Sequence, residues 1–234
     1  MLKIENTEVL GWEHAIRGMR NPLNSWAKSD SEVSICECEH WPHDVKKSFV
    51  CLGSNNLDLM KRLRNAGTDH RKFMRMIVVY VDLTAPLYWW KEFDTYKVGT
   101  VANSTSTMHK LASTPITIDC FETDDYEDGL DYDGEILGDI IGEHIEFLEK
   151  MRLKYLETKD KRCWKELIRW LPSAWLQTRT VTMSYENLFA MCSKGQRRFH
   201  KLTEWSAAFM DWARTLPYAQ ELIFIDELDN KDNN

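Results

Sequence analysis

MIVVYVDLTAP, residues 76–86, is the stretch of sequence that most constrains the fold. Its first eight residues are mainly β-branched, aromatic or otherwise apolar, which is typical of a β-strand. Pro86 lacks a backbone N–H and should end the strand. The next residues, PLYWWKEF (86–93), have helical spacing with a proline in the first turn. We therefore predict a strand that leads directly into a helix.

Further strands and helices follow in an irregular order. We predict strands over residues 114–121 and 174–183, where the composition is β-branched and partly alternating. Apolar residues spaced by three and four predict the helices, with Gly67 as a C-terminal cap, Ser184 as an N-terminal cap and Pro172 as a stop. These helices cover residues 57–67, 134–157, 163–171, 185–192 and 197–216. The order predicts an α+β fold, a small mixed or antiparallel sheet flanked by long helices.

Length and composition are those of a soluble globular protein. The chain has 234 residues, of which 43% are hydrophobic and 29% charged. With no repeat and no flexible linker, we expect one domain over residues 1–225 and a frayed acidic tail at 226–234. There is no stretch that resembles a transmembrane helix or a signal peptide, so we expect a cytoplasmic protein with no membrane partner. The net charge of −7 argues against nucleic-acid binding, although a single nucleotide needs only a few local cations.

Two segments contain residues that bind metals in other proteins. Cys36, Cys38, His40 and His43 lie within eight residues, without the long spacer that closes a zinc knuckle. The acidic loop at 122–135 contains only a fragment of the calcium-loop pattern. We therefore expect no metal, and we interpret the cysteines as small apolar side chains and the acidic loop as solvated.

Basic residues gather at the ends of two predicted elements. They are His70, Arg71, Lys72 and Arg75 ahead of the first strand, and Arg197, Arg198, His200 and Lys201 at the start of the last helix. Arginine pairs bidentately with phosphate, and the first turn of a helix offers free N–H donors. The segment GQRRFHK (195–201) is therefore either a phosphate site or a solvated basic face.

The segment YKVGTVANSTSTMHKL, residues 96–111, is rich in hydroxyl and amide side chains and carries no acid. It is either a solvated turn or the lining of a site for a ligand with many oxygen atoms. Its position after a strand and an aromatic run favours the lining.

Taken in order, these segments resemble the flavin-dependent thymidylate synthase family, also called thymidylate synthase complementing proteins. The resemblance spans roughly residues 55–217 and rests on order and spacing. IVVYVDLTAP (77–86) ends like the family's entry to its signature region, and WWKEFDTYKVGTVANSTSTMHKL (89–111) falls where the family carries Arg-His-Arg, then Ser, Asn and Ser. LIRWLPSAWLQTRTVTMSYENL (167–188) and QRRFHKLTEW (196–205) resemble its later segments.

The resemblance implies a reaction and an assembly. In that family the signature loop holds FAD and the nucleotide dUMP. Reduced flavin, supplied with electrons by NADPH, takes part in moving a one-carbon unit from methylenetetrahydrofolate to the uracil ring. The enzymes are homotetramers with active sites shared between subunits. By resemblance we expect a homo-oligomer, a tetramer, that binds a pyrimidine nucleotide.

The resemblance also implies roles for individual residues. Asn103 and Ser106 keep the family's Asn-x-x-Ser spacing, which makes Ser106 the expected phosphate contact. Lys97 and Arg197 complete the expected nucleotide site. Arg197 and Arg169 are the expected catalytic residues. The expected cofactor-binding residues are Tyr96, Lys97, Thr100, Asn103, His70 and Arg75.

The chain departs from the family at the arginines of the signature. The Arg-His-Arg triplet appears as Thr95, Tyr96 and Lys97, one position out of register, and the last arginine is Met108 or Thr107. In electrostatic catalysis, loss of one such donor typically costs ~10²–10³ in rate. Three hypotheses follow: a diverged flavin enzyme that modifies dUMP or a related nucleotide, a nucleotide-binding protein without flavin chemistry, or an oligomeric structural protein.

Overall fold

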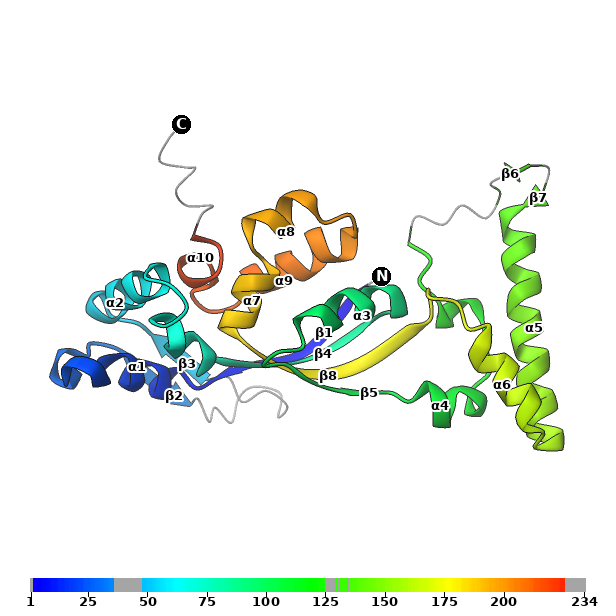
Figure 1. Ribbon diagram of the computed structural model, residues 1–234, viewed down its shortest axis with the longest axis horizontal. Helices are drawn as coiled ribbons and strands as arrows, with labels where there is room; N and C mark the ends of the chain where they lie inside the picture. Colours follow the sequence, from blue (N-terminus) through cyan, green and yellow to red (C-terminus); the bar gives the residue numbers. More distant parts are fainter. Residues whose placement is uncertain (1, 36–47, 125–128, 130, 134, 226–234) are drawn as a thin grey trace, which may run out of the picture. The chain divides into compact units, whose positions relative to one another are not determined.

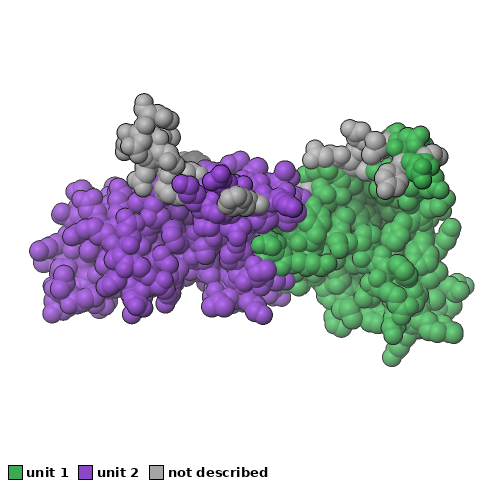
Figure 2. Space-filling model, turned by 45° about the horizontal axis from the view of Figure 1, so that its top comes forward, with its two compact units in different colours: residues 1–3, 84–92, 104–179 green, residues 4–83, 93–103, 180–234 purple. Residues whose placement is uncertain are grey.

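The computed structural model describes residues 2–35, 48–124, 129, 131–133 and 135–225 (Figure 1). The chain divides into two compact units (Figure 2). Unit 1 comprises residues 1–3, 84–92 and 104–179, and unit 2 comprises residues 4–83, 93–103 and 180–234. One domain over residues 1–225 stays a prediction, and the tail at 226–234 lies outside the described residues.

The longest strands form a four-stranded sheet in the order β1-β4-β8-β5. These strands are β1 (Lys3–Leu10), β4 (Val78–Pro86), β8 (Leu176–Ser184) and β5 (Val101–Ser104). Two antiparallel hairpins add β2 (Glu32–Ile35) with β3 (Ser48–Cys51), and β6 (Asp131–Tyr132) with β7 (Glu135–Ile136). Together with the helices, these strands confirm the predicted α+β fold class.

The alternation of side chains in β4 accounts for its place inside the sheet. Val79, Val81 and Leu83 are at most 1% exposed, whereas Tyr80 is 41% exposed. Opposite the core, Asp82 accepts hydrogen bonds from Thr180 on β8 (2.6 Å) and from Asn6 on β1 (2.7 Å). These two hydrogen bonds, the one from Thr180 first, hold the pKa of the Asp82 carboxyl below its ordinary value. Three strands are thus also joined through side chains.

Unit 2 contains most of the helices, all of them short or of moderate length. They are α1 (Trp12–Arg20), α2 (Ser54–Asn65), α7 (Tyr185–Met191), α8 (Lys194–Phe199), α9 (Met210–Arg214) and α10 (Ala219–Leu222). The 3₁₀ turns are η1 (Asn21–Leu23), η2 (Trp26–Lys28), η3 (Arg71–Arg75) and η4 (Asp94–Tyr96), and η7 (Glu204–Phe209) is a π-helix. The core is strongly aromatic, with Trp12, Tyr185, Trp205, Phe209 and Phe224 all at most 1% exposed.

Unit 1 is built on two helices, α5 (Leu137–Thr158) and α6 (Lys161–Arg169). Its shorter elements are α3 (Leu87–Phe93, of which Phe93 belongs to unit 2), α4 (Thr107–Lys110), η5 (Leu111–Ser113) and η6 (Ile118–Cys120). Leu111, Ile116, Phe121, Leu148 and Leu167 form its core. The buried guanidinium of Arg152 is paired with Glu149 at 2.5 Å, which compensates its charge.

The strand predicted over residues 114–121 is wrong. Pro115 has no N–H to donate, and Ile116 N donates to the carboxylate of Glu149 (2.9 Å) instead of to a strand. Residues Ile118–Cys120 form the 3₁₀ turn η6, and only Phe121 makes a β-bridge, to Trp175. The apolar residues of this segment therefore belong to a turn, of which Ile116 and Phe121 join the core of unit 1.

The single helix predicted over residues 197–216 is also wrong. Helix α8 ends at Phe199, and His200 has extended backbone angles. The His200 Nδ1 accepts a hydrogen bond from Leu202 N (3.2 Å), so a side chain replaces the helical carbonyl acceptor. The helix resumes as the π-helical η7 and then α9. Trp205 and Phe209 are buried.

Other predicted elements are confirmed with shifted ends. Helix α2 begins at Ser54, three residues earlier than predicted, because the Asp30 carboxylate accepts from Asn55 N and Asn56 N. Gly67 has φ of +105°, as its role after the helix end requires. The sequence did not predict β1, α1 or β2. Among the described residues, no helix is both long enough and apolar enough to cross a membrane.

Candidate functional site

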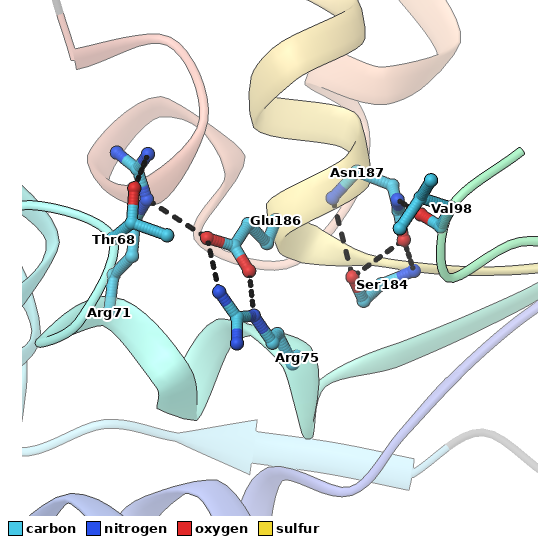
Figure 3. Close-up of polar contacts among 7 residues, drawn as sticks. All are labelled: Thr68, Arg71, Arg75, Val98, Ser184, Glu186 and Asn187. Carbon is cyan, nitrogen blue, oxygen red and sulfur yellow. Dashed lines mark hydrogen bonds and ion pairs between the residues drawn. The ribbon is translucent and has the colours of Figure 1, made fainter. Parts of the chain in front are cut away.

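The junction between β8 and α7 positions the polar groups of unit 2 (Figure 3). Ser184 ends the strand and caps the helix, as predicted, in a reciprocal capping box with Asn187. The Ser184 Oγ accepts from Asn187 N (3.3 Å), and the Asn187 Oδ1 accepts from Ser184 N (3.0 Å). The buried Tyr185 follows, so the first turn of α7 is fixed and presents Glu186 and Asn187 in defined directions.

Glu186 binds two arginines of the 3₁₀ turn η3 (Figure 3). Its carboxylate accepts from Arg71 Nε at 3.1 Å and also pairs with Arg75. Burial acts to raise the pKa of Glu186, but the hydrogen bonds from Arg75 and Arg71 outweigh it and leave that pKa below its ordinary value. Arg75, expected from the sequence to bind a cofactor, is thus bound to a carboxylate.

Asn187 holds the beginning of the hydroxyl-rich loop (Figure 3). Its Nδ2 donates to the backbone oxygen of Val98 at 2.8 Å. The adjacent Gly99 has φ of +83°, a conformation that favours glycine, and an added Cβ would lie 3.4 Å from Asn187 Oδ1. The turn that leads from η4 into β5 is therefore anchored on α7.

Tyr96 joins this loop to α8. Its hydroxyl accepts from Gln196 Nε2 at 2.6 Å, and its ring stacks on buried Trp205 at 5.5 Å between centroids. His200 also stacks on Trp205, at 4.9 Å. The structure thus brings together the two segments that the sequence singled out, the loop after residue 95 and the basic segment 195–201. We call this cluster of Tyr96, Gln196, His200 and Trp205 the aromatic cluster.

Two cations flank the aromatic cluster. Lys97 is exposed at the end of η4. Arg197 is half-buried, donates from Nη1 to the Cys192 oxygen at 2.5 Å, and lies over the Phe224 ring at 5.6 Å from its centroid. Lys97 therefore presents its charge to solvent, and Arg197 is held by backbone and aromatic contacts.

The other predicted site residues have varied surroundings. Thr100 Oγ1 lies 3.4 Å from the backbone carbonyl oxygen of Tyr96, and Asn103 is exposed on β5. His70 is exposed beside η3. Ser106 and Arg169 belong to unit 1. There the Ser106 Oγ caps α4 by accepting from His109 N (3.0 Å), and Arg169 pairs with Glu166. Their roles in binding or catalysis remain predictions.

The four residues that the sequence offered as possible metal ligands, Cys36, Cys38, His40 and His43, lie outside the described residues, so the expectation that they bind no metal stays a prediction. Across the part of the chain that is described, no three His, Cys, Asp or Glu residues are arranged to hold a metal ion.

Sequence reasoning missed Glu186, Asn187 and Gln196. The available indication for the first two was SYEN (184–187), in which a capping serine is followed by an acid and an amide within one turn. For Gln196 there was no such indication, because its partner Tyr96 lies 100 residues away.

Known proteins share the fold of this chain but not its sequence. The sequence matches no protein-family model and no curated protein. The structure, however, has the fold of the flavin-dependent thymidylate synthases and of a related nucleotide methylase.

Three solved structures illustrate this similarity. Thymidylate Synthase X (ThyX) from Helicobacter pylori with FAD and dUMP has a TM-score of 0.64 at 14% identity, over 97% of this chain and 98% of that one. A second complex of that enzyme with FAD and dUMP has a TM-score of 0.61 at 14% identity, over 95% and 99%. The UMP/dUMP methylase PolB from Streptomyces cacaoi, bound with 5-Br dUMP, has 0.57 at 9% identity, over 96% and 94%.

Replacing Glu186 tests the role of its ion pairs. Glu186→Gln should lower the free energy of unfolding at neutral pH by about 1–3 kcal/mol, because the ion pairs with two arginines are lost. The folded-state pKa of Glu186 lies below 4.5, so the contribution is present above that pH and disappears as pH falls through the lowered pKa. Urea unfolding at neutral and acidic pH measures this convergence of variant and wild type.

The matched control is Asp211→Asn, which removes a pair with Arg214 in which Asp211 is 71% exposed. This exposed pair should contribute less than about 1 kcal/mol. Equal losses for the two variants at neutral pH, or a loss for Glu186→Gln that does not shrink in acid, would contradict the assigned role.

Proposed function

We propose that the protein binds a pyrimidine nucleoside monophosphate at the loop 96–103 and helix α8 of unit 2. The observation that carries the proposal is the Gln196–Tyr96 hydrogen bond, which holds the hydroxyl-rich loop against the basic helix. The phosphate is the group with most charge to neutralise, and Lys97 and Arg197 on the two segments supply cations for it. Thr100 and Asn103 supply polar groups on the loop.

The similar solved proteins support this choice of ligand. Two structures of the Helicobacter pylori enzyme contain dUMP, and the Streptomyces cacaoi methylase contains a brominated dUMP. The nucleotide is thus common to these solved proteins, whereas their sequences differ strongly from this chain. A protein of the same fold that retains a cationic and hydroxyl-bearing loop is most simply explained as a binder of the same class of nucleotide.

Thermal unfolding with dUMP tests the proposal. A saturating concentration should raise the melting temperature. At a hundredfold excess over Kd, binding adds about 2.7 kcal/mol to the free energy of unfolding. Lys97→Ala and Arg197→Ala should each reduce this shift, because each removes a cation from the phosphate. Lys194→Ala, on the exposed surface of the same helix, should leave it unchanged.

Arg197→Ala also removes packing within unit 2, so the Lys97 variant decides the outcome. If dUMP raises the melting temperature equally in wild type and in Lys97→Ala, the loop is not part of the site. No shift in wild type with dUMP, UMP or dCMP would overturn the proposal.

A second candidate is flavin-dependent transfer of a one-carbon unit to the nucleotide, with NADPH and methylenetetrahydrofolate as co-substrates. The FAD in the two Helicobacter pylori structures favours it. The residues of this chain do not fit the FAD diphosphate well, however. Lys97 is the one cation in residues 95–106, and Arg71 and Arg75 are bound to Glu186. We therefore derive no step through flavin.

Absorbance separates the two candidates. The purified protein should lack the visible flavin band, and after incubation with FAD and gel filtration it should carry no stoichiometric flavin. The matched comparison is Glu186→Gln, which releases Arg71 and Arg75 and should increase any residual FAD binding. Stoichiometric FAD in the wild-type protein would favour the second candidate, in which the nucleotide is bound beside a flavin.

We further propose that the protein is a homo-oligomer, a tetramer by resemblance. All four residues of the edge strand β5 are exposed, and Val98 and Val101 are 84% and 69% exposed. An edge strand with apolar side chains is a template for association unless another chain covers it. A second copy of this chain is the proposed cover.

Mass measurement by light scattering tests this assembly. The wild-type protein should have a multiple of the 27.6 kDa chain mass, and Val101→Glu should reduce it because a buried charge is costly. Leu23→Glu, at a site 83% exposed in unit 2, is the control and should not. A monomeric wild type, or equal masses for wild type and Val101→Glu, would contradict this interface.

A further inference from the structure

A cleft of about 340 Å³ opens in unit 2 among α1, η2 and the segment before α2. It is lined by Glu13, Ile16, Arg17, Arg20, Trp26, Ser29, Ser31 and Val33. None of these residues belongs to the nucleotide site proposed above. The lining combines two cations, hydroxyl groups, an indole ring and apolar side chains, with a single acid.

The cleft contains a buried and incompletely satisfied arginine. Arg20 is 4% exposed, and its guanidinium donates from Nε to Asn56 Oδ1 (2.7 Å) and from Nη1 to the Ser25 oxygen (3.2 Å). Its Nη2 is buried and has no hydrogen-bond partner among the described residues. A buried charged donor without an acceptor is costly, so the Arg20 guanidinium is the group on the lining that would gain most from a bound anion.

The neighbours of Arg20 hold its guanidinium in place. Asn56 is fully buried, and its Nδ2 donates to Ser29 Oγ (2.9 Å) and Ser31 Oγ (2.6 Å). Asp30, between the two serines in sequence, accepts hydrogen bonds from the first N–H groups of α2. Its carboxylate therefore caps that helix and does not accept a hydrogen bond from Arg20 Nη2. A fixed donor loses little conformational entropy when an anion binds.

Trp26 provides a flat surface on the same cleft. Its side chain is 50% exposed, and its indole N–H donates to Asn21 Oδ1 (2.9 Å). Because the polar edge of the ring is bonded, the rest of the ring is available for apolar and stacking contacts. Arg17, also exposed, adds a second cation on the lining.

We propose that this cleft binds a small organic anion carried on a planar ring, in which a carboxylate or phosphate oxygen pairs with Arg20 and Arg17 and the ring lies against Trp26. A carboxylate and a phosphate share the oxygen acceptors that a guanidinium recognises. This inference does not depend on the proposed nucleotide site, and the experiment below distinguishes the two.

Fluorine NMR with labelled probes tests the proposal on the full-length protein. The probes are 4-fluorobenzoate, 4-fluorophenyl phosphate and the neutral 4-fluorobenzamide, and Kd is obtained from line broadening on titration. At least one anion should bind, and the amide should bind at least about tenfold more weakly because it lacks charge. The tighter of the two anions identifies which acid the cleft accepts.

Variants of the lining assign the contacts. Arg17→Gln and Trp26→Ala alter exposed side chains and should each raise the Kd of the anion several-fold. Arg20→Gln should raise that Kd by about tenfold or more. Lys28→Gln, exposed on η2 and outside the lining, is the matched control and should leave Kd unchanged. If Arg20→Gln fails to fold, the two exposed variants still decide the outcome.

Any of four results would overturn the proposal. The first is that no anion binds, and the second is that the amide binds as tightly as the anions. The third is that the Arg17 and Trp26 variants bind the probes like wild type. The fourth is that Lys97→Ala, outside the lining of the cleft, weakens probe binding, which would place the probes in the nucleotide site.

Discussion

The capping box between Ser184 and Asn187 is the constraint on which the arrangement of unit 2 depends. It ends β8 and starts α7 within one residue, so Tyr185 points into the core, where its hydroxyl donates to the Pro217 oxygen (2.7 Å). The same turn directs Glu186 to η3 and Asn187 to the Val98 backbone. Loss of the cap would leave N–H groups in the first turn of α7 unpaired and would destabilise the turn that carries both contacts, at a cost of typically ~1 kcal/mol.

The distribution of charge in unit 2 follows from this junction. Glu186 pairs with the two arginines that precede β4, and Lys97 is the exposed cation of residues 96–103. In a chain with a net charge of −7, such pairing determines where an anion can be held. Within the basic cluster at 70–75, Arg71 and Arg75 are thus already paired with a carboxylate, whereas Lys72 is exposed.

What could be predicted from the sequence depended on the range of the interactions involved. Strand β4, helix α5 and the Ser184 cap rest on local patterns and were predicted correctly. The strand at 114–121 and the unbroken last helix failed because one contact, from Glu149 or His200, overrode the local pattern. In the site, composition indicated the loop and the basic segment. It could not indicate that Glu186 pairs with Arg71 and Arg75, because more than 100 residues separate them.

The aromatic cluster limits how a nucleotide would be recognised at the proposed site. Tyr96 and His200 both stack on Trp205, which is itself fully buried. The indole is thus engaged by the protein's own rings, and a pyrimidine would have to displace one of them to stack there. Recognition of the base would then rest on hydrogen bonds, for which the loop offers Thr100 and Asn103. Polar recognition discriminates strongly between bases that differ in one donor or acceptor, because an unmatched group stays unpaired.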